Sequence, residues 1–231
     1  YLPRKFKIAV ALPPRNDVDV FSNCLGYVGI SENNKIVGYN VLVGGGLGMT
    51  HGKTTTFPRL ADVIGFCTPE QAVQVAEEVV KIQRDFGDRS DRRHARLKYT
   101  IEDRGVEWFK EELNQRLGWD LEPARDFLFE STTDRYGWNQ DADGSWTYGL
   151  FFEGGRLRDK SKLAIREIAS SIPCEFRLTA NQNLVIARIS NDDKGKIDEI
   201  LAKYSVLLPS DLSGLRLNSI ACTALPTCSL A

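Results

Sequence analysis

A turn-rich stretch over residues 119–144 constrains the fold of this chain more than any other feature, because it separates two regions of regular structure. Pro123, Gly137 and the Asp143-Gly144 pair lie within it, and residues of these types interrupt helices and strands. Short apolar strands and amphipathic helices occur in mixed order on both sides, which favours an α+β fold. We therefore predict a first domain over residues 1–140, a second over 141–206 and a further segment over 207–231.

Length and charge narrow the possible functions. At 231 residues the chain can bury a substantial core without disulfides, and a net charge of −1 gives no basic field for nucleic acid. No apolar run approaches the roughly 20 residues that span a bilayer. Five scattered cysteines favour a reducing compartment, so we expect a cytoplasmic location. The absence of an initiator Met suggests a fragment or a processed product.

The region before the turn-rich stretch is expected to begin with a strand over residues 5–11, followed by a hairpin over 26–30 and 35–43. Thr68, Pro69 and Gln71 resemble a helix start with a capping box, and apolar spacing continues that helix to about Phe86. A second helix is predicted over about 106–117, with Gly118 as its C-cap.

After the turn-rich stretch the expected strands cover 146–153, 156–158, 175–179 and 184–189. Helices are predicted over 162–171 and 192–204, the latter capped by Asn191 or Asp192. This order is typical of a ferredoxin-like half-domain. From Val206 onward the chain reads as a loop.

The glycine run over residues 44–48 follows a predicted strand. It lacks the Lys-Ser/Thr of a phosphate-binding loop, so nucleotide binding is the least favoured interpretation. Glycines allow positive φ and close backbone approach. A flat, bulky ligand lying against the backbone and a simple tight turn remain open.

Two basic clusters lie beside these elements. One comprises Arg84, Arg89, Arg92, Arg93, Arg96 and Lys98, and the other Arg4, Lys5 and Lys7. If residues 92–98 were helical, Arg92 and Arg96 would share a face, and stacked like charges need an anionic partner. The clusters indicate either a solvated surface or a site for a polycarboxylate or a small oxyanion.

Two further motifs occur in the second half of the chain. Asn181-Gln182-Asn183 separates two predicted strands and is often only a hairpin turn. Cys222 and Cys228 lie in a small, apolar, Pro-containing segment that suits an iron–sulfur cluster better than zinc, although the spacing alone favours two buried structural thiols. Cys24, Cys67 and Cys174 read as core residues. His51 and His94 form no evident hydrolase or metal motif.

Five motifs in order, taken together, resemble the sirohaem and iron–sulfur sulfite/nitrite reductase family. They are Tyr1–Lys7, Val43–Gly48, Asp91–Tyr99, Thr179–Asn183 and Ala221–Cys228. The resemblance covers essentially the whole chain. The Leu-Pro-Thr-Cys form of the last motif is more similar to sulfite than to nitrite reductases, and the region Gly48–His51 is more similar to ferredoxin-linked members.

The resemblance implies a sulfite/nitrite reductase-like sirohaem domain, the first repeat of the family, followed by a ferredoxin-like half-domain and the start of a second repeat. It also implies six-electron reduction of sulfite to sulfide at sirohaem coupled to a 4Fe–4S cluster, with ferredoxin or a flavoprotein as electron donor. The alternatives are a nitrite reductase fragment and a non-catalytic module that binds anions or a partner protein.

The site residues implied by the resemblance fall into three groups. They are Lys5 and Lys7 as catalytic residues facing the oxyanion; Arg92, Arg96, Lys98, Asn181, Gln182 and Asn183 as sirohaem-binding residues; and Cys222 and Cys228 as the first two cluster ligands. The second cysteine pair of the family is not present in this sequence. We therefore expect the chain to be inactive alone.

Overall fold

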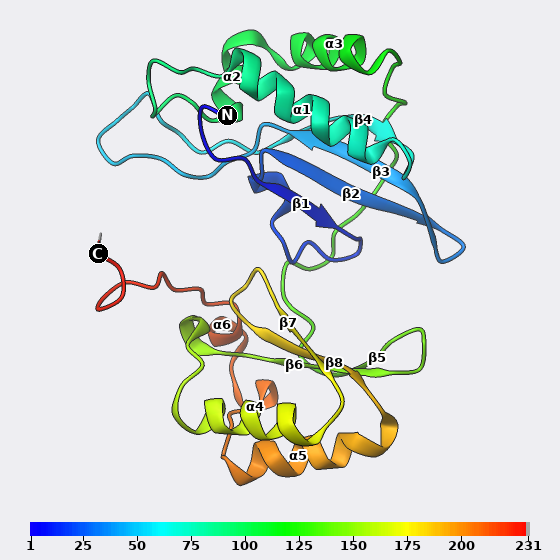
Figure 1. Ribbon diagram of the computed structural model, residues 1–231, viewed down its shortest axis with the longest axis vertical. Coiled ribbons are helices and arrows are strands. Elements are labelled where there is room, and N and C mark those ends of the chain that lie inside the picture. Colours follow the sequence, from blue (N-terminus) through cyan, green and yellow to red (C-terminus); the bar gives the residue numbers. More distant parts are fainter. Residues whose placement is uncertain (230–231) are drawn as a thin grey trace. The chain divides into compact units, whose positions relative to one another are not determined.

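The computed structural model describes residues 1–229, so the last two residues of the predicted 207–231 segment lie outside it. The chain forms two compact units, Tyr1–Thr132 and Thr133–Ala231, whose boundary falls inside the turn-rich stretch. Each unit contains a four-stranded sheet with helices (Figure 1), which confirms the α+β class. The domain limits at residues 140 and 206 stay predictions. No helix in the described part of the chain is both long and apolar enough to cross a membrane.

The sheet of the first unit has the order β1-β2-β3-β4. Its strands are β1 (Ile8–Ala11), β2 (Leu25–Glu32), β3 (Lys35–Val43) and β4 (Asp62–Cys67). β1 pairs with β2 in parallel, and the other pairs are antiparallel. The predicted first strand is therefore shorter than expected, since residues 5–7 only lead into it. β4 was not anticipated from the sequence.

The predicted hairpin between β2 and β3 is confirmed. Glu32 pairs with Lys35, and the two residues between them, Asn33 and Asn34, have φ values of 50° and 62°. Two successive left-handed residues form the turn whose twist matches the flanking strands, and asparagine tolerates that conformation better than most residues.

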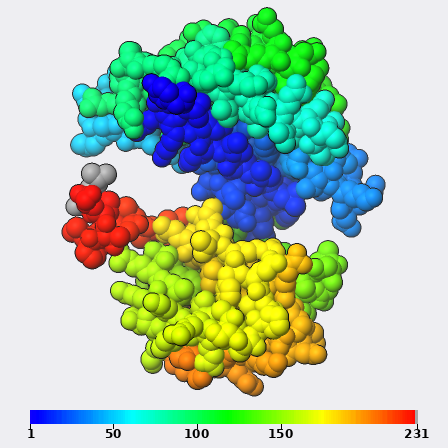
Figure 2. All heavy atoms as spheres, viewed as in Figure 1, coloured from blue at the N-terminus to red at the C-terminus, as the bar shows by residue number. Residues whose placement is uncertain are grey.

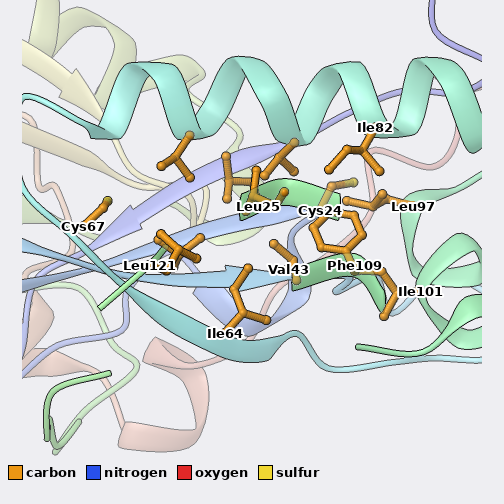
Figure 3. Close-up of a cluster of buried hydrophobic side chains, with 14 of the residues drawn as sticks. Cys24, Leu25, Val43, Ile64, Cys67, Ile82, Leu97, Ile101, Phe109 and Leu121 are labelled. Atoms are coloured by element: carbon orange, nitrogen blue, oxygen red, sulfur yellow. The ribbon is translucent and has the colours of Figure 1, made fainter. Parts of the chain in front are cut away.

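Three helices lie on the same face of this sheet (Figure 1): α1 (Ala72–Phe86), α2 (Leu97–Arg104) and α3 (Val106–Leu117). Figure 3 shows side chains from the sheet and the helices packed together beneath α1. Gly118 ends α3 with a φ of 77°, as predicted. The predicted start of α1 at Thr68 and Pro69 is wrong, because α1 begins at Ala72 with Gln71 at its N-cap. In the turn before the helix, the Thr68 N–H donates to Gln71 Oε1 at 2.9 Å.

The expectation that residues 92–98 could be helical is wrong. α2 begins at Leu97, and residues 92–94 form a turn in which the His94 N–H donates to the Asp91 carbonyl at 3.0 Å. Arg92 and Arg96 therefore do not share a helical face, and the argument from stacked like charges does not apply to them.

The second unit has an antiparallel sheet in the order β5-β6-β8-β7. Its strands are β5 (Gly137–Gln140), β6 (Trp146–Leu150), β7 (Glu175–Leu178) and β8 (Leu184–Ile189), and its helices are α4 (Asp159–Ser171), α5 (Lys194–Lys203) and the short α6 (Gly214–Leu217). α4 and α5 cover one face of the sheet (Figure 1). Buried apolar residues of both helices, such as Ile168 and Leu201, pack against Leu150 and Ile186.

Two local predictions in the second unit are wrong. Residues 156–158 form no strand and instead lead into α4. The cap before α5 is neither Asn191 nor Asp192. The N-cap of α5 is Asp193, which makes no side-chain capping hydrogen bond. Ser190 instead caps the short 3-10 turn Asn191–Asp193 that leads into α5, because its hydroxyl accepts a hydrogen bond from the Asp193 N–H at 3.2 Å.

Candidate functional site

The glycine loop, residues 44–48, leaves β3 with its first three N–H groups already bonded. Gly44 donates to Cys24, Gly45 to Asn23 and Gly46 to Arg59, each to a backbone carbonyl at 2.8–3.0 Å. A phosphate-binding loop needs such N–H groups free to face the anion. The nucleotide interpretation is therefore excluded for this part of the loop.

The carbonyls of the glycine loop face a buried cation. Lys98, which is 1% exposed, donates from Nζ to the carbonyls of Gly46 at 2.9 Å and Gly48 at 2.8 Å, and also to that of Phe57. Burial and, secondarily, the nearby Arg96 lower the pKa of Lys98. Lys98 is the second residue of α2, and its contacts place this end of the predicted basic stretch against the glycine loop.

Arg96 lies on the same side of the loop. A Cβ added at Gly46 would come within 3.2 Å of Arg96 Nη2 and 3.3 Å of Lys98 Cδ, so both cations contact this glycine. Arg96 Nη2 donates to Cys24 Sγ at 3.3 Å, whereas its buried Nε has no hydrogen-bond partner among residues 1–229. A buried guanidinium N–H without an acceptor is costly, and a ligand oxygen that reached it would remove that cost.

Lys5 and Lys7 lie in the extended segment before β1, at the surface of the first unit (Figure 2, blue). Both side chains are exposed, while Phe6 between them packs against the core, as alternation in an extended segment requires. The segment is linked to the chain around Arg96 by buried Gln83, whose Nε2 contacts the carbonyls of Arg4 at 3.5 Å and Ala95 at 3.4 Å.

Arg92 lies apart from Arg96 and Lys98, in the exposed turn at residues 91–94. The preceding Asp88 orders this turn, because its Oδ1 accepts hydrogen bonds from the N–H groups of Ser90 and Asp91 at 2.7 and 3.0 Å. These bonds lower the pKa of Asp88 to about 2. The structure thus brings Arg96 and Lys98 together and leaves Arg92 on the surface.

The residues of the first unit fit a carboxylate-bearing ligand. Within the described residues, neither Arg96 nor Lys98 forms a salt bridge, and the partners of Lys98 are neutral carbonyls. Two cations without a counter-anion suit an anionic ligand, which would meet these side chains and not the Gly46 backbone, because Arg96 and Lys98 fill the space beside it. Carboxylates such as those of sirohaem would supply the missing negative charge.

In the second unit, Asn181 and Asn183 are organised around a carboxylate. Asp134, only 5% exposed, accepts from Asn181 Nδ2 at 3.0 Å, from Asn183 Nδ2 at 2.8 Å and from the Thr179 hydroxyl at 2.7 Å. Asn183 also accepts from the Phe152 N–H at 2.9 Å. Burial, and then the charge of Asp134, raise the pKa of the neighbouring Tyr136.

Gln182 differs from its two neighbours because it contacts the cysteine-bearing segment. With a φ of 67° at the tip of the turn, its amide donates to the Ala221 carbonyl at 2.9 Å and accepts from the Ala221 N–H at 3.4 Å. On the other side of Cys222, Arg156 Nη2 donates to the Thr223 carbonyl at 2.5 Å. Gln182 and Arg156 therefore hold the backbone on both sides of Cys222.

Cys222 and Cys228 lie in the C-terminal segment that protrudes from the body of the second unit (Figure 2, red). Cys222 is exposed and Cys228 partly buried, and both are free thiols. The Cys228 N–H donates to the Ala224 carbonyl at 2.8 Å, so the two cysteines flank a tight turn. In residues 1–229 no group of three or more His, Cys, Asp or Glu side chains is arranged to hold a metal ion.

Three residues that organise these regions were not singled out in the sequence. Arg59 bonds to the glycine loop through its backbone and through Nη1, which donates to the Gly44 carbonyl at 3.2 Å. Asp134 and Arg156 serve the amide turn and the Cys222 segment. All three lie in irregular regions, where sequence periodicity carries no signal. Only the asparagines of the motif at 181–183 hinted at a buried acceptor.

Family comparisons cover most of the chain. Residues 1–121 match the model for the nitrite and sulphite reductase 4Fe-4S domain, and residues 139–204 match the nitrite/sulfite reductase ferredoxin-like half domain.

Individual relatives agree with this match. The chain is 54% identical to a sulfite reductase [NADPH] hemoprotein beta-component of Anoxybacillus flavithermus and 53% identical to that of Bacillus subtilis. In both cases the alignment covers 100% of this chain and 41% of the relative. The structure of the NirA protein of Mycobacterium tuberculosis matches with a TM-score of 0.80 and 28% identity, over 96% of this chain and 39% of that one.

Proposed function

Because this chain belongs to the nitrite and sulphite reductase family, we propose that its full-length protein reduces sulfite to sulfide with six electrons, using sirohaem and a 4Fe–4S cluster. The curated relatives, of which this chain spans 41% of the length, are named as sulfite reductase hemoproteins, which supports sulfite over nitrite. The Leu225–Cys228 sequence supports the same choice.

The observation that carries the proposal is the position of Arg96 and Lys98 against Gly46. Sirohaem has several carboxylates, and an anionic ligand would supply the counter-charge that both cations lack within the described residues. Arg96 Nε, buried and without an acceptor, would gain one. When bound, the cofactors supply the redox-active metal at which sulfite is reduced.

Lys5 and Lys7 are proposed to bind the substrate oxyanion and to donate protons. Their ammonium groups are exposed and lie on one face of an extended segment. Removal of the oxygens of sulfite as water consumes protons as well as electrons, so cationic proton donors suit both binding and catalysis. Arg92 is proposed to contribute a more distant positive charge, since it lies in the exposed turn.

In the second unit, the amide turn is proposed to lie beside the macrocycle, with Gln182 as its exposed member. Cys222 and Cys228 are proposed as two of the cluster ligands. A 4Fe–4S cluster is held by about four thiolates, so these two cysteines alone would not complete it. The 231-residue chain by itself is therefore expected to be inactive.

The name of the curated relatives favours a flavoprotein that passes on electrons from NADPH, while the sequence at Gly48–His51 favours ferredoxin. A cytoplasmic location fits both donors.

Activity of the full-length protein tests the proposal directly. Purified protein should reduce sulfite with a chemical electron donor such as reduced methyl viologen. Lys5→Met or Lys7→Met should lower kcat/KM for sulfite at least about a hundredfold, because each substitution removes a positive charge that would stabilise the bound oxyanion. Lys35→Met, on the β2–β3 hairpin, is the matched control. Faster turnover of nitrite than of sulfite would contradict the substrate assignment, and a protein inert to both would leave only an anion- or partner-binding module.

Cofactor recognition is tested separately from turnover. Sirohaem added to the 231-residue chain should bind saturably, as followed by its Soret band. Arg96→Gln should lower the affinity about tenfold, since one charge-assisted hydrogen bond to the cofactor is lost. Arg93→Gln, three residues away in the exposed turn, is the control. Equal binding by both variants would show that Arg96 does not contact the cofactor.

A further inference from the structure

A cavity in the second unit lies outside all the predicted site residues except Cys222. It has a volume of about 560 Å³, within the range of small-molecule sites. Most of its lining residues lie between Phe151 and Ser161, and the others are residues 205–207, Arg216, Ala221 and Cys222. The cavity therefore lies between the start of α4 and the C-terminal segment.

Its charged lining is predominantly cationic. Four cations, Arg156, Arg158, Lys160 and Arg216, face two carboxylates, Glu153 and Asp159. Glu153 pairs with Arg216 at 3.2 Å, and Asp159 lies 3.8 Å from Arg158. The excess positive charge therefore belongs to Arg156 and Lys160. In the described part of the chain neither has a carboxylate partner.

Arg156 connects the cavity to the cysteine-bearing segment. One of its terminal nitrogens donates to the Thr223 carbonyl, and a guanidinium has five N–H donors, so others remain for a ligand. The Lys160 ammonium group has no hydrogen bond or salt bridge within the described residues, and its exposed side chain is free to turn toward a bound group. Cys222, whose backbone neighbours are held by Gln182 and Arg156, lies in the wall of the same cavity.

We propose that this cavity binds a compact polyanion through Arg156 and Lys160, against the segment that carries Cys222. A ligand with two or more oxyanion groups, either carboxylates or phosphates, would match the two cations. It would also use the volume of the cavity, which is larger than a single carboxylate or phosphate needs. The proposal does not depend on the reaction of the full-length protein. It gives the second unit an anion-binding role that neither the family match nor the motifs assign to it.

Binding is measured by titration calorimetry of the 231-residue chain at low salt, with citrate and with pyrophosphate as probes, since exposed charges are screened at high salt. At least one probe should bind. Lys160→Gln should lower the affinity for that probe about tenfold, whereas Lys160→Arg should retain the affinity. Lys162→Gln, on the same helix but outside the cavity lining, should bind as the unchanged protein does. Preference for one probe identifies whether carboxylate or phosphate is recognised.

The location is tested by thiol protection. A saturating probe should slow the alkylation of Cys222 by iodoacetamide, read by peptide mass spectrometry, while Cys228, which does not line the cavity, serves as the internal reference. The proposal is overturned if neither probe binds, if Lys160→Gln and Lys162→Gln bind equally well, or if Cys222 and Cys228 are protected to the same extent. Lys160 is exposed, so its substitution tests binding without threatening the fold.

Discussion

In the first unit two cations, Arg96 and Lys98, lie against the peptide groups of the glycine loop, whereas in the second unit a carboxylate, Asp134, is enclosed by the side chains of Thr179, Asn181 and Asn183. Both arrangements bury charge, but their hydrogen bonds are completed differently. Asp134 receives donors on both oxygens from its own unit. Arg96 keeps a buried N–H without an acceptor.

The hydrogen bonds around Asp134 are therefore complete and structural, whereas those around Arg96 leave one donor without an acceptor. The amide groups of Asn181 and Asn183 donate to Asp134 and fix the turn at 179–183. Gln182 instead contacts the segment around Ala221. Three neutral carbonyls take all three N–H donors of the buried Lys98 ammonium group without neutralising its charge, so Lys98 would attract an external anion through its charge and not through a hydrogen bond. Residues with the same predicted role in the sequence thus have different roles in the two units.

The largest expected difference between the units is in thiol reactivity. Burial raises the pKa of Cys67 in the first unit to about 12, and its side chain is fully buried, whereas Cys222 in the second unit is exposed. At pH 8, Cys222 should react with iodoacetamide more than about a thousandfold faster than Cys67, because Cys67 must await local opening of the core. Peptide mass spectrometry over time measures both rates. Comparable rates would mean that the first core opens readily.

Removal of the Asn183 amide should destabilise the second unit by about 3 kcal/mol. Asn183→Ala leaves the Phe152 N–H without its acceptor and Asp134 without one of its donors, and both groups are buried. Hydrogen exchange of β8 amides reports the second unit and that of β3 amides the first, which should not change. Gln182→Ala, at the exposed tip of the same turn, should cost less than about 1 kcal/mol. Similar losses for both variants would refute the structural role of Asn183.

Lys98→Met should destabilise the first unit by a smaller amount, about 2 kcal/mol. The substitution deprives the carbonyls of Gly46, Gly48 and Phe57 of their donor, but it also relieves the desolvation of a buried ammonium group. Exchange of the β3 amides should accelerate while that of β8 stays constant. Unchanged or increased stability would show that desolvation of the ammonium group destabilises the fold by at least as much as its hydrogen bonds stabilise it. That result would strengthen the case for an anion at this position.

The smallest expected effect concerns pH and the exposed turn. The N–H of Asp91, followed by the hydroxyl and N–H of Ser90, lowers the pKa of Asp88 from 3.8 to about 2. Because the folded pKa is depressed, the stabilisation is present above pH 4 and is lost as the pH falls through 2. Proteolysis of the turn by pepsin should therefore increase between pH 4 and pH 2. In Asp88→Asn, cleavage corrected for the pH dependence of pepsin should be constant over that range.

Much of the fold could be predicted from periodicity and turn chemistry. The β2–β3 hairpin followed from Asn33-Asn34, and α3 from its apolar spacing and Gly118. α2 could not be recognised, because Arg96 provides no capping side chain and the helix follows a run of charges. β4 was missed because its short apolar run lacks alternation. Residues 156–158 were assigned to a strand, although the chain there serves to begin α4.

The candidate site was predictable only in part. Residue types and order indicated which side chains belong together, and the structure does place Arg96 and Lys98 against one glycine. Spacing along the chain could not show that Arg92 lies in a separate turn, since that depends on the Asp88 hydrogen bonds. It also could not show that Asn181 and Asn183 serve Asp134, which lies more than forty residues earlier.

The close packing of the glycine loop also sets how far this sequence can vary. A Cβ added at Gly45 would lie 2.2 Å from the carbonyl oxygen of Phe21. Because that oxygen belongs to the backbone, no change of side-chain rotamer could make room for the added atom. At Gly48 nothing lies within 4 Å of the same added atom. In a saturation-mutagenesis library selected for folded protein, position 45 should tolerate glycine alone, while position 48, three residues away, should accept many side chains. Two glycines of one short loop thus differ widely in mutational tolerance.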